Sequence, residues 1–252
     1  MTNDLDRALD RAAELIRNAR RTVAFTGAGI SVESGIDPFR GPGGLWSKVD
    51  PEKFHKRYFT AHPAESWELL KEIFYATLDK VQPNPAHLAL ARLEQAGKLG
   101  GVITQNIDHM HQRAGSRTVH EYHGTLGLLD CLQCRRKTPT EEVSLEVLPP
   151  PCPICGGLLK PDIVFFGEPI PEEAYQGSLT ETEQCDVMLL VGTSGEVMPA
   201  SRLPHMAKNN GAAIIEVNVQ PSAYTGHLTD VFLMGKAGET LTRLADAVLG
   251  PA

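Results

Sequence analysis

Residues 23–41 read VAFTGAGISVESGIDPFRG, and this stretch decides the fold. It begins as a buried β-strand and turns through Gly27 and Gly29, as many nucleotide-binding loops do. A dinucleotide fingerprint of the form G-x-G-x-x-G would place a third glycine at position 32, but Val32 stands there. The two glycines would let a phosphate approach the backbone, although a tight strand-to-helix turn would use them equally well.

Working outward from this stretch, apolar runs that alternate with helical patterns predict a parallel sheet. The strand-like runs lie at 22–26, 101–104, 186–191, 213–217 and 229–234. Apolar residues at helical spacing mark 87–96 and 239–249. This alternation is typical of an α/β fold in which helices cover both faces of the sheet.

Two segments interrupt the alternation. Residues 45–83 are helical in pattern and rich in aromatic residues, and residues 126–159 contain closely spaced cysteines. We expect these two insertions to form a smaller domain. The larger, nucleotide-binding domain would then comprise 1–44, 84–125 and 160–252.

Polar and glycine residues follow several of the predicted strands, at the edge where parallel sheets bind ligands. The stretch after the second strand is the most informative, because amide and carboxylate groups are concentrated there. A helix cap would explain Asp108 but not its polar neighbours. The residues at these strand ends are Gln105, Asn106, Ile107 and Asp108, then Gly192, Thr193 and Ser194, and finally Asn218.

The four clustered cysteines predict a structural zinc site. They form two C-x2-C pairs separated by seventeen residues, Cys131 with Cys134 and Cys152 with Cys155. Four thiolates at this spacing can surround Zn²⁺ tetrahedrally and leave no position open for catalysis. The fifth cysteine, Cys185, precedes an apolar strand and is expected to be a small buried hydrophobic residue.

Composition excludes several classes of protein. The chain has 252 residues and a net charge of −7, which argues against a dedicated nucleic-acid binder, including a DNA-binding zinc ribbon. No run of 18 or more apolar residues is present, so no membrane span is expected. The N-terminal stretch lacks a signal-peptide pattern and the cysteine pairs suit a reducing compartment, so we expect a cytoplasmic protein.

Two histidines, His120 and His123, are candidates for a general base, since imidazole titrates near neutral pH. Either could instead be structural. Gly124 follows His123 and would leave room for a ligand beside that ring.

Taken together, the motifs resemble those of the sirtuins, the NAD-dependent protein lysine deacylases, of the bacterial type. The matching stretches, in the family's order, are GAGISVESGIDPFRG (27–41), TQNIDHMHQRAG (104–115), HG (123–124), the two cysteine pairs, KPDIVFFGE (160–168), GTSGEVMPA (192–200) and GKAGE (235–239). The resemblance covers nearly the whole chain. It implies a doubly wound, Rossmann-like sheet with a smaller zinc-ribbon and helical module, NAD as co-substrate and acyl-lysine peptides or proteins as substrates. We expect a monomer.

The resemblance also implies roles for individual residues. His123 would be the general base, with Asn106 and Asp108 as further catalytic residues. The cofactor would be bound by Gly27, Ala28, Gly29, Phe39, Arg40, Gln105, Asn106, Ile107, Asp108, Gly192, Thr193, Ser194, Asn218 and Ala237. The peptide would lie as a strand between Val164, Phe165, Phe166, Gly167 and Glu168 on one side and Gly195 and Val197 on the other.

The implied reaction moves an acyl group and no hydride. The acyl-lysine oxygen attacks the ribose as nicotinamide leaves, and His123 accepts a proton through the ribose hydroxyls. The products are nicotinamide, free lysine and O-acetyl-ADP-ribose. Alternatives are mono-ADP-ribosyl transfer to a protein nucleophile and a non-catalytic, NAD-binding scaffold.

Three departures from the family pattern bear on activity. Asp37-Pro38 reverses the usual order before Phe39, which affects how that ring is aimed. Gly195 replaces a common leucine and is expected to loosen one rim of the peptide groove. Desuccinylating relatives carry a Tyr-x-x-Arg pair, whereas Tyr75 has no arginine three residues later. We therefore expect uncharged acyl groups, acetyl first.

Overall fold

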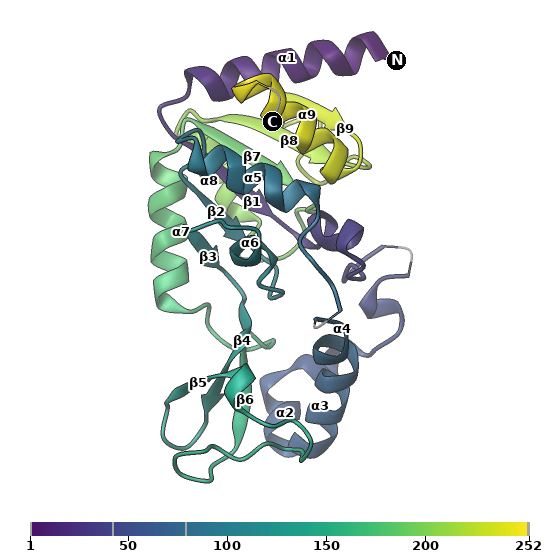
Figure 1. Cartoon of the computed structure of the whole chain (residues 1–252), viewed down its shortest axis with the longest axis vertical. Coiled ribbons are helices and arrows are strands. Elements are labelled where there is room, and N and C mark those ends of the chain that lie inside the picture. The colour runs from purple at the N-terminus through teal and green to yellow at the C-terminus, as the bar shows by residue number, and fades with distance from the viewer. Residues whose placement is uncertain (1, 42, 79, 251–252) are drawn as a thin grey trace.

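The computed structural model describes residues 2–41, 43–78 and 80–250. Residue 42, within the loop 30–44 that we expect to close over the cofactor (the cofactor loop), and the ends of the chain lie outside the described residues. Figure 1 shows two parts stacked along the long axis of the molecule. The upper part is built on a six-stranded sheet in the order β3-β2-β1-β7-β8-β9, and the lower part contains a three-stranded sheet in the order β5-β4-β6.

The large sheet has parallel neighbours throughout. Its strands are β1 (Thr22–Thr26), β2 (Gly101–Thr104), β3 (Val119–Glu121), β7 (Val187–Val191), β8 (Ala213–Asn218) and β9 (Val231–Met234). From β1 the chain builds outward to β3 on one side and then, from β7 to β9, on the other. This is the doubly wound order, and it places a topological switch point between β1 and β7.

Successive side chains of a strand point to opposite faces of the sheet, so the strands contribute residues to two separate hydrophobic cores. Within β1, Ala24 belongs to one core whereas Val23 and Phe25 belong to the other. Helices α1 (Thr2–Asn18), α5 (Pro85–Gln95) and α9 (Ala237–Leu249) cover the first face, and α7 (Glu172–Gln184) and α8 (Arg202–Asn209) cover the second. The predicted α/β class with two covered faces is confirmed.

Helix α5 begins at a capping box that also fixes a buried histidine. Asn84 accepts a hydrogen bond from Ala86 N at 2.9 Å, and its own N–H donates to His87 Nδ1 at 3.3 Å. Pro85 occupies the first helical position, where its missing N–H costs nothing. The cap therefore holds the His87 ring at the N-terminal end of the helix, beside the loop that follows β1.

The lower part combines the two insertions. Residues 45–78 form η2 (Leu45–Ser47), η3 (Pro51–Phe54), α2 (Lys56–Ala61), α3 (Pro63–Leu70), the π-helix η4 (Lys71–Tyr75) and α4 (Ala76–Leu78). The antiparallel strands are β4 (Gly124–Cys131), β5 (Lys137–Pro139) and β6 (Leu159–Ile163), with the short helix η5 (Thr140–Glu142) after β5. Strands β4 and β6 thus extend across positions 126 and 159, where the sequence suggested boundaries.

The two insertions share one hydrophobic core. Trp67 of α3 is fully buried, and its indole N–H donates to the carbonyl of Leu159 in β6 at 2.8 Å. The rings of Phe59 and Phe165 lie 5.3 Å apart in the same core. Segments distant in sequence therefore stabilise each other as one unit.

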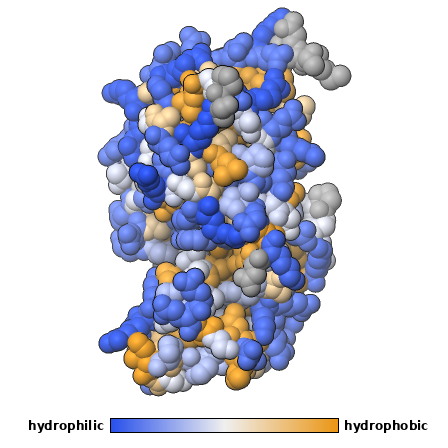
Figure 2. All heavy atoms as spheres, in the orientation of Figure 1, coloured by the Kyte–Doolittle hydropathy of each residue, from blue (hydrophilic) through white to orange (hydrophobic). Residues whose placement is uncertain are grey.

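Two further helices are short: η1 (Ala28–Ser34) follows β1, and α6 (Met110–Arg113) follows β2. Within the described part of the chain, no helix combines the length and apolar character needed to cross a bilayer. Hydrophobic atoms do reach the surface at the waist between the upper and lower parts (Figure 2).

Candidate active site

A cavity of about 1090 Å³ lies at the carboxyl ends of the central strands, against the lower part of the molecule. This is the switch-point location where doubly wound sheets bind ligands. Nearly all residues singled out from the sequence line it. They are Gly27, Ala28, Gly29, Phe39, Arg40, Gln105, Asn106, Ile107, His123, Val164, Phe165, Phe166, Gly167, Glu168, Gly192, Thr193, Ser194, Val197, Asn218 and Ala237. Two others, Asp108 and Gly195, do not line it.

The glycines after β1 are required by the neighbouring loop. Gly27 N donates to Val191 O at 3.0 Å and Gly29 N donates to Gly192 O at 2.8 Å. A Cβ on Gly29 would lie 2.7 Å from the Cα of Gly192, which itself has φ +60°. Close approach of two loops, as well as access for a ligand, therefore explains the glycines that open the cavity.

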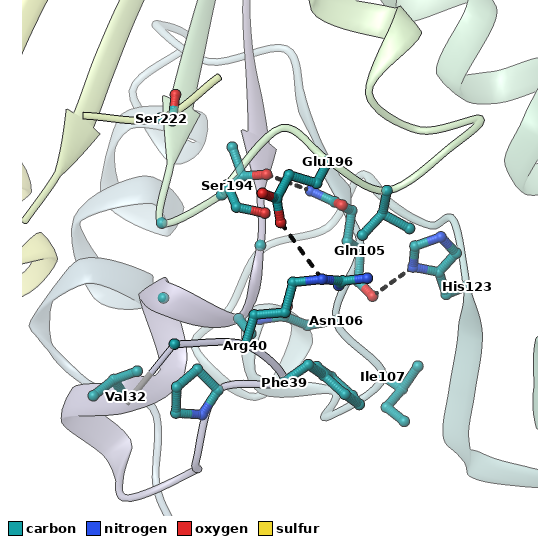
Figure 3. Close-up of a pocket in the computed structure, with 18 of the residues that line it drawn as sticks. Val32, Phe39, Arg40, Gln105, Asn106, Ile107, His123, Ser194, Glu196 and Ser222 are labelled. Atoms are coloured by element: carbon teal, nitrogen blue, oxygen red, sulfur yellow. Dashed lines mark hydrogen bonds and ion pairs between the residues drawn. The ribbon is translucent and has the colours of Figure 1, made fainter. Parts of the chain in front are cut away.

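Three polar side chains tie the strand ends together. The Gln105 amide donates to Thr193 Oγ1 at 3.0 Å, and the Asn218 amide donates to the Thr193 carbonyl at 3.0 Å. These bonds join the ends of β2, β7 and β8 along the floor of the cavity. Ser194 extends into the cavity beside them (Figure 3).

A buried polar network stands behind the cavity. Ser31 Oγ donates to Asp108 Oδ2 at 2.6 Å and accepts from the Asn106 amide at 3.1 Å. The NH₂ group of Asn106 is used in this way, whereas its Oδ1 is buried with no partner among the described residues. That oxygen is an acceptor available to a ligand N–H group. Asp108 also accepts from Met110 N at 3.0 Å, so it both caps α6 and orients Ser31.

Two buried histidines, His87 and His111, complete this network with their rings 5.0 Å apart. Burial lowers the pKa of His87 to about 4, and the nearby Asp108 opposes that shift only in part. Burial also lowers the pKa of His111 well below its usual range. Both imidazoles are therefore neutral at pH 7. His111 Nε2 lies 2.9 Å from the Thr26 hydroxyl, which in turn donates to Thr104.

His123 has the geometry of a general base. Its Nδ1 lies 3.0 Å from the Gln105 carbonyl, which can only accept, so Nδ1 carries the proton and Nε2 is the basic nitrogen (Figure 3). Burial lowers the pKa of His123, and the bond to Gln105 opposes this shift. Gly124 has φ +76°, and a Cβ there would lie 2.0 Å from Asp162 O. The glycine thus lets β4 turn sharply beside the histidine.

His120 is placed elsewhere. Its Nε2 lies 3.8 Å from Glu181 Oε1, on the side of β3 that faces α7. A Cβ on Gly177 of α7 would lie only 2.4 Å from the His120 ring. Of the two candidate bases, only His123 lines the cavity.

An aromatic wall closes the cavity toward the lower part. Phe39 and Phe166 were singled out from the sequence, whereas Trp46, Phe54 and Phe74 were not. Phe39 of the cofactor loop lies 5.4 Å from Trp46 and 6.3 Å from Phe74. Phe54 lies 5.2 Å from Trp46, and Phe166 lies 6.0 Å from Trp46. The density of aromatic residues in 45–83 was the only signal available, because the fold alone brings these rings together.

Tyr75 does not belong to this wall. Its ring stacks on Trp67 at 6.0 Å, and its hydroxyl is buried in the lower core with no partner among the described residues. Burial raises the pKa of Tyr75. Its neighbour Phe74 faces the cavity instead.

An ion pair lies at the opposite rim of the cavity. Arg40 Nε lies 3.5 Å from Glu196 Oε2, so the pair bridges the mouth of the cavity (Figure 3). Gly195 does not leave this rim loose as expected. Its φ is +77°, and a Cβ there would lie 2.8 Å from the Tyr224 ring, which already fills the space.

Sequence reasoning also missed the loop after Asn218. Residues 219–223 line the cavity, and Ser222 is drawn there in Figure 3. Lys236 lines it as well, between the end of β9 and α9. The position of this loop at the end of a parallel strand was a usable signal, but its residue types are those of an ordinary turn.

The four clustered cysteines converge as predicted. Their sulfur atoms all lie within 4.8 Å of one another, including 3.5 Å between Cys131 and Cys155 and 3.9 Å between Cys134 and Cys152. A tetrahedral Zn²⁺ with Zn–S bonds of about 2.3 Å would place its ligands roughly 3.8 Å apart. The donor set and spacing fit structural zinc, at the far end of β4 from His123.

The doubly wound sheet, the cavity at its switch point and the four-thiolate module together define a nucleotide-binding α/β enzyme with a structural metal site. The chain belongs to the Sir2 family, whose profile matches residues 27–199.

Curated and solved relatives agree with this assignment. The NAD-dependent protein deacylase 2 of Pyrobaculum aerophilum is 47% identical over 244 residues, with 94% of each chain covered. The crystal structure of a Sir2 homologue in complex with NAD has a TM-score of 0.87 at 39% identity, covering 94% of this chain and 93% of that one. A Sir2 histidine variant with a deacetylated p53 peptide and 3′-O-acetyl-ADP-ribose has a TM-score of 0.88 at 34% identity, covering 97% and 99%.

Proposed function

We propose that this protein is an NAD-dependent protein lysine deacylase that removes acetyl groups first. It transfers the acyl group to ADP-ribose and releases nicotinamide and free lysine. The observation that carries the proposal is that one cavity joins a dinucleotide-type floor, an imidazole base and an apolar aromatic wall. Few other reactions need all three.

The floor of the cavity would hold the cofactor. The loops at Gly27–Gly29 and Gly192–Ser194 would face the pyrophosphate, while Asn218 and Ala237 would hold the adenosine half. Gln105, Asn106 and Ile107 would surround the nicotinamide and its ribose. The free Oδ1 of Asn106 supports this assignment, because a carboxamide N–H group would satisfy it. Asp108 would act from behind, by orienting Ser31.

The aromatic wall would hold the lysine stem and its acyl group. Trp46, Phe54, Phe74 and Phe166 offer no charged partner to a carboxylate on the acyl chain, and Tyr75 is turned away from them. This arrangement supports uncharged acyl groups over succinyl or malonyl groups. The peptide backbone would pair with the segments 164–168 and 195–197 as an added strand.

His123 would supply base catalysis. NAD supplies an activated ribose when it is bound, and the Nε2 atom of His123 would accept a proton from the ribose hydroxyls. Base catalysis of this kind contributes about 10²–10⁴-fold. Phe39 and Arg40 would close over the ribose and keep water from it.

The proposal extends to the protein's setting. None of the five cysteines forms a disulfide, which supports a reducing compartment such as the cytoplasm. The net charge of −7 supports protein substrates over nucleic acids.

Mass spectrometry of an acetyl-lysine peptide, incubated with the protein with and without NAD, tests the proposal. We expect loss of the acetyl group only with NAD, together with equal amounts of nicotinamide and O-acetyl-ADP-ribose. ADP-ribose attached to a protein would instead identify a mono-ADP-ribosyltransferase. NAD binding without any turnover across acyl groups would identify a scaffold, and either result would overturn the proposal.

A further inference from the structure

A buried lysine lies directly beneath the segment proposed to bind the peptide. Lys160 of β6 is only 6% exposed and does not itself line the cavity. Its ammonium donates to the carbonyls of Pro161 at 2.9 Å and Ile163 at 2.8 Å. It also lies 3.1 Å from Glu168 Oε2 and 4.5 Å from the centre of the Phe165 ring. A buried ammonium needs such partners, and here each one belongs to residues 161–168.

The partner carboxylate closes a turn. Glu168 Oε2 also accepts from Phe165 N at 3.0 Å, and Glu168 N donates back to Phe165 O at 2.9 Å. Gly167 within this turn has φ +84°, and a Cβ there would lie 2.8 Å from the His55 ring. The turn is therefore held by the lysine below it and by the helical insertion beside it.

Backbone hydrogen bonds connect this turn to residues around the cavity. Val164 N donates to the carbonyl of His123 at 2.9 Å. Phe166 N donates to Phe54 O at 2.9 Å, and Lys56 N donates to Phe166 O at 3.0 Å. The segment 163–168 thus joins the candidate base to the aromatic wall, and Lys160 reaches both of its ends.

We infer that Lys160 is a positioning residue for the acyl-lysine peptide and acts through Glu168. The two side chains form a buried clasp that fixes the segment 163–168, including its turn at Gly167, in the shape that this side of the peptide groove requires. This inference rests on the proposed function, in which that segment is one wall of the peptide groove. The clasp should govern peptide binding while leaving the cofactor floor intact, because it makes no contact with the Gly27 or Gly192 loops.

A merely stabilising role predicts something different. Removing one member of a buried ion pair leaves an uncompensated charge, whereas replacing both with apolar residues often restores stability. Lys160→Met should therefore destabilise the fold more than the double variant Lys160→Met/Glu168→Leu. Because Glu168 itself lines the cavity and Lys160 does not, Lys160→Met is the variant that separates the two roles. If the clasp only stabilises the fold, Lys160→Met should lose peptide and NAD affinity in parallel. If the clasp positions the segment, peptide binding should stay weak even when stability is restored.

The experiment compares the wild type, the two clasp variants and Lys160→Arg with the control Lys137→Met. Lys137 of β5 makes a more exposed ion pair with Asp162 of β6, at 2.6 Å between the two outer strands of the same small sheet. The measurements are thermal unfolding, KM and kcat for an acetyl-lysine peptide, and NAD affinity by calorimetry. For Lys160→Met, and also for the double variant, we expect a peptide KM about ten-fold higher, equal to about 1.4 kcal/mol, with NAD affinity within about two-fold of the wild type. Lys160→Arg, which keeps the cation, should recover part of the loss, and the control should change neither.

An unchanged peptide KM in a folded double variant would overturn the inference, as would parallel loss of peptide and NAD binding. Hydrogen exchange at the Phe165 amide gives a readout that needs no turnover. It should be faster in the double variant and unchanged in Lys137→Met, and an unchanged rate in the double variant would refute the clasp. A wild type without deacylase activity would refute the proposed function while leaving this exchange test valid.

Discussion

His120 and His123 stand three residues apart, yet their surroundings give them different chemistry. His123 reaches the cavity with its Nε2 unprotonated, because its Nδ1 proton is held by the Gln105 carbonyl. His120 faces the Glu181 carboxylate on the side of the sheet that α7 covers.

Replacing His123 with alanine should reduce kcat for deacylation by about 10²–10⁴-fold, because the base is removed. The affinity for NAD should stay within a few-fold, since the cofactor floor is untouched. Isothermal calorimetry and steady-state kinetics measure the two quantities. His205→Ala, an exposed histidine on α8, serves as the matched control. Loss of NAD affinity equal to the loss of rate would contradict the assigned role.

The pH profile gives a second check on the same residue. Burial lowers the pKa of His123 below the ordinary histidine value of about 6.5, so the neutral, basic form persists below the pH at which an exposed histidine would be protonated. The acid limb of kcat/KM should therefore lie below pH 6.5 and should vanish in the residual activity of His123→Ala. An acid limb at or above pH 7 would exclude His123 as the base.

At the scale of elements, the strands predicted from the sequence are the ones that form runs of apolar residues. Strands β1, β2, β7 and β8 are apolar runs in the interior of the large sheet and β9 is an apolar run at its edge, and all five were predicted within about two residues. Strand β3 was not predicted, because this short edge strand is half-buried along its length and shows no apolar pattern. The small-sheet strands were hidden for a related reason, since proline, lysine and cysteine occupy many of their positions.

The candidate site was predictable wherever chemistry is written into local motifs, as in residues 104–108 and the cysteine pairs. The aromatic wall was not, because Trp46, Phe54 and Phe74 meet only through tertiary packing. The consequence of Gly195 was also misjudged, since Tyr224 comes from a distant segment to fill the space beside it. Contacts between residues far apart in the chain cannot be predicted from the spacing of residues in the sequence.

The four-cysteine module should depend on its metal. We expect one zinc ion per chain by atomic emission, and chelation or Cys134→Ser should lower the free energy of unfolding by about 2 kcal/mol or more. Two of the ligands, Cys131 and Cys152, belong to the core shared by the insertions, so peptide binding should weaken before NAD binding does. Full stability and full activity of a metal-free preparation would contradict this expectation.

The reversed Asp37-Pro38 order has a local structural counterpart. Asp37 Oδ2 lies 2.6 Å from Lys48 Nζ, and both side chains are largely exposed. Exposed pairs contribute less than about 1 kcal/mol. Asp37→Asn and Lys48→Met should therefore each change the KM for NAD by less than about five-fold, and their effects should be nearly additive in a double-mutant cycle. A change of more than ten-fold from Asp37→Asn alone would instead indicate direct contact with the cofactor.

At the scale of the whole molecule, one buried carboxylate on helix α7 connects that helix to β3 and to the residue before β1. Glu181 of α7 accepts from the Arg21 guanidinium at 2.8 Å, immediately before β1, and faces His120 of β3 at 3.8 Å. Burial by itself raises the pKa of Glu181, but interactions with His120 and Arg21 outweigh it and hold the value at about 2. The shorter contact is with Arg21, so we assign it the larger part of the stabilisation.

The sign of the pH effect follows from that depressed pKa. The contribution of Glu181 is complete above the ordinary glutamate pKa of 4.5 and is lost as the pH falls toward 2. Glu181→Gln should lower the free energy of unfolding by about 1–3 kcal/mol at pH 7, since Arg21 is partly exposed to solvent. Urea denaturation at pH 7 and pH 3 should show the gap between variant and wild type narrowing at the lower pH. A constant gap would refute the assignment.

The shared core of the two insertions has an evolutionary consequence. The wall that would select the acyl group and the floor that would bind the cofactor are carried on separate stretches of the gene, so each can diverge while the other is kept. The helical insertion that carries Trp46, Phe54 and Phe74 of the wall, however, interlocks with the cysteine-containing insertion at Trp67 and Leu159. A chimera that exchanges only one insertion between relatives should be poorly folded, whereas one that exchanges both together should transfer acyl preference as a single trait.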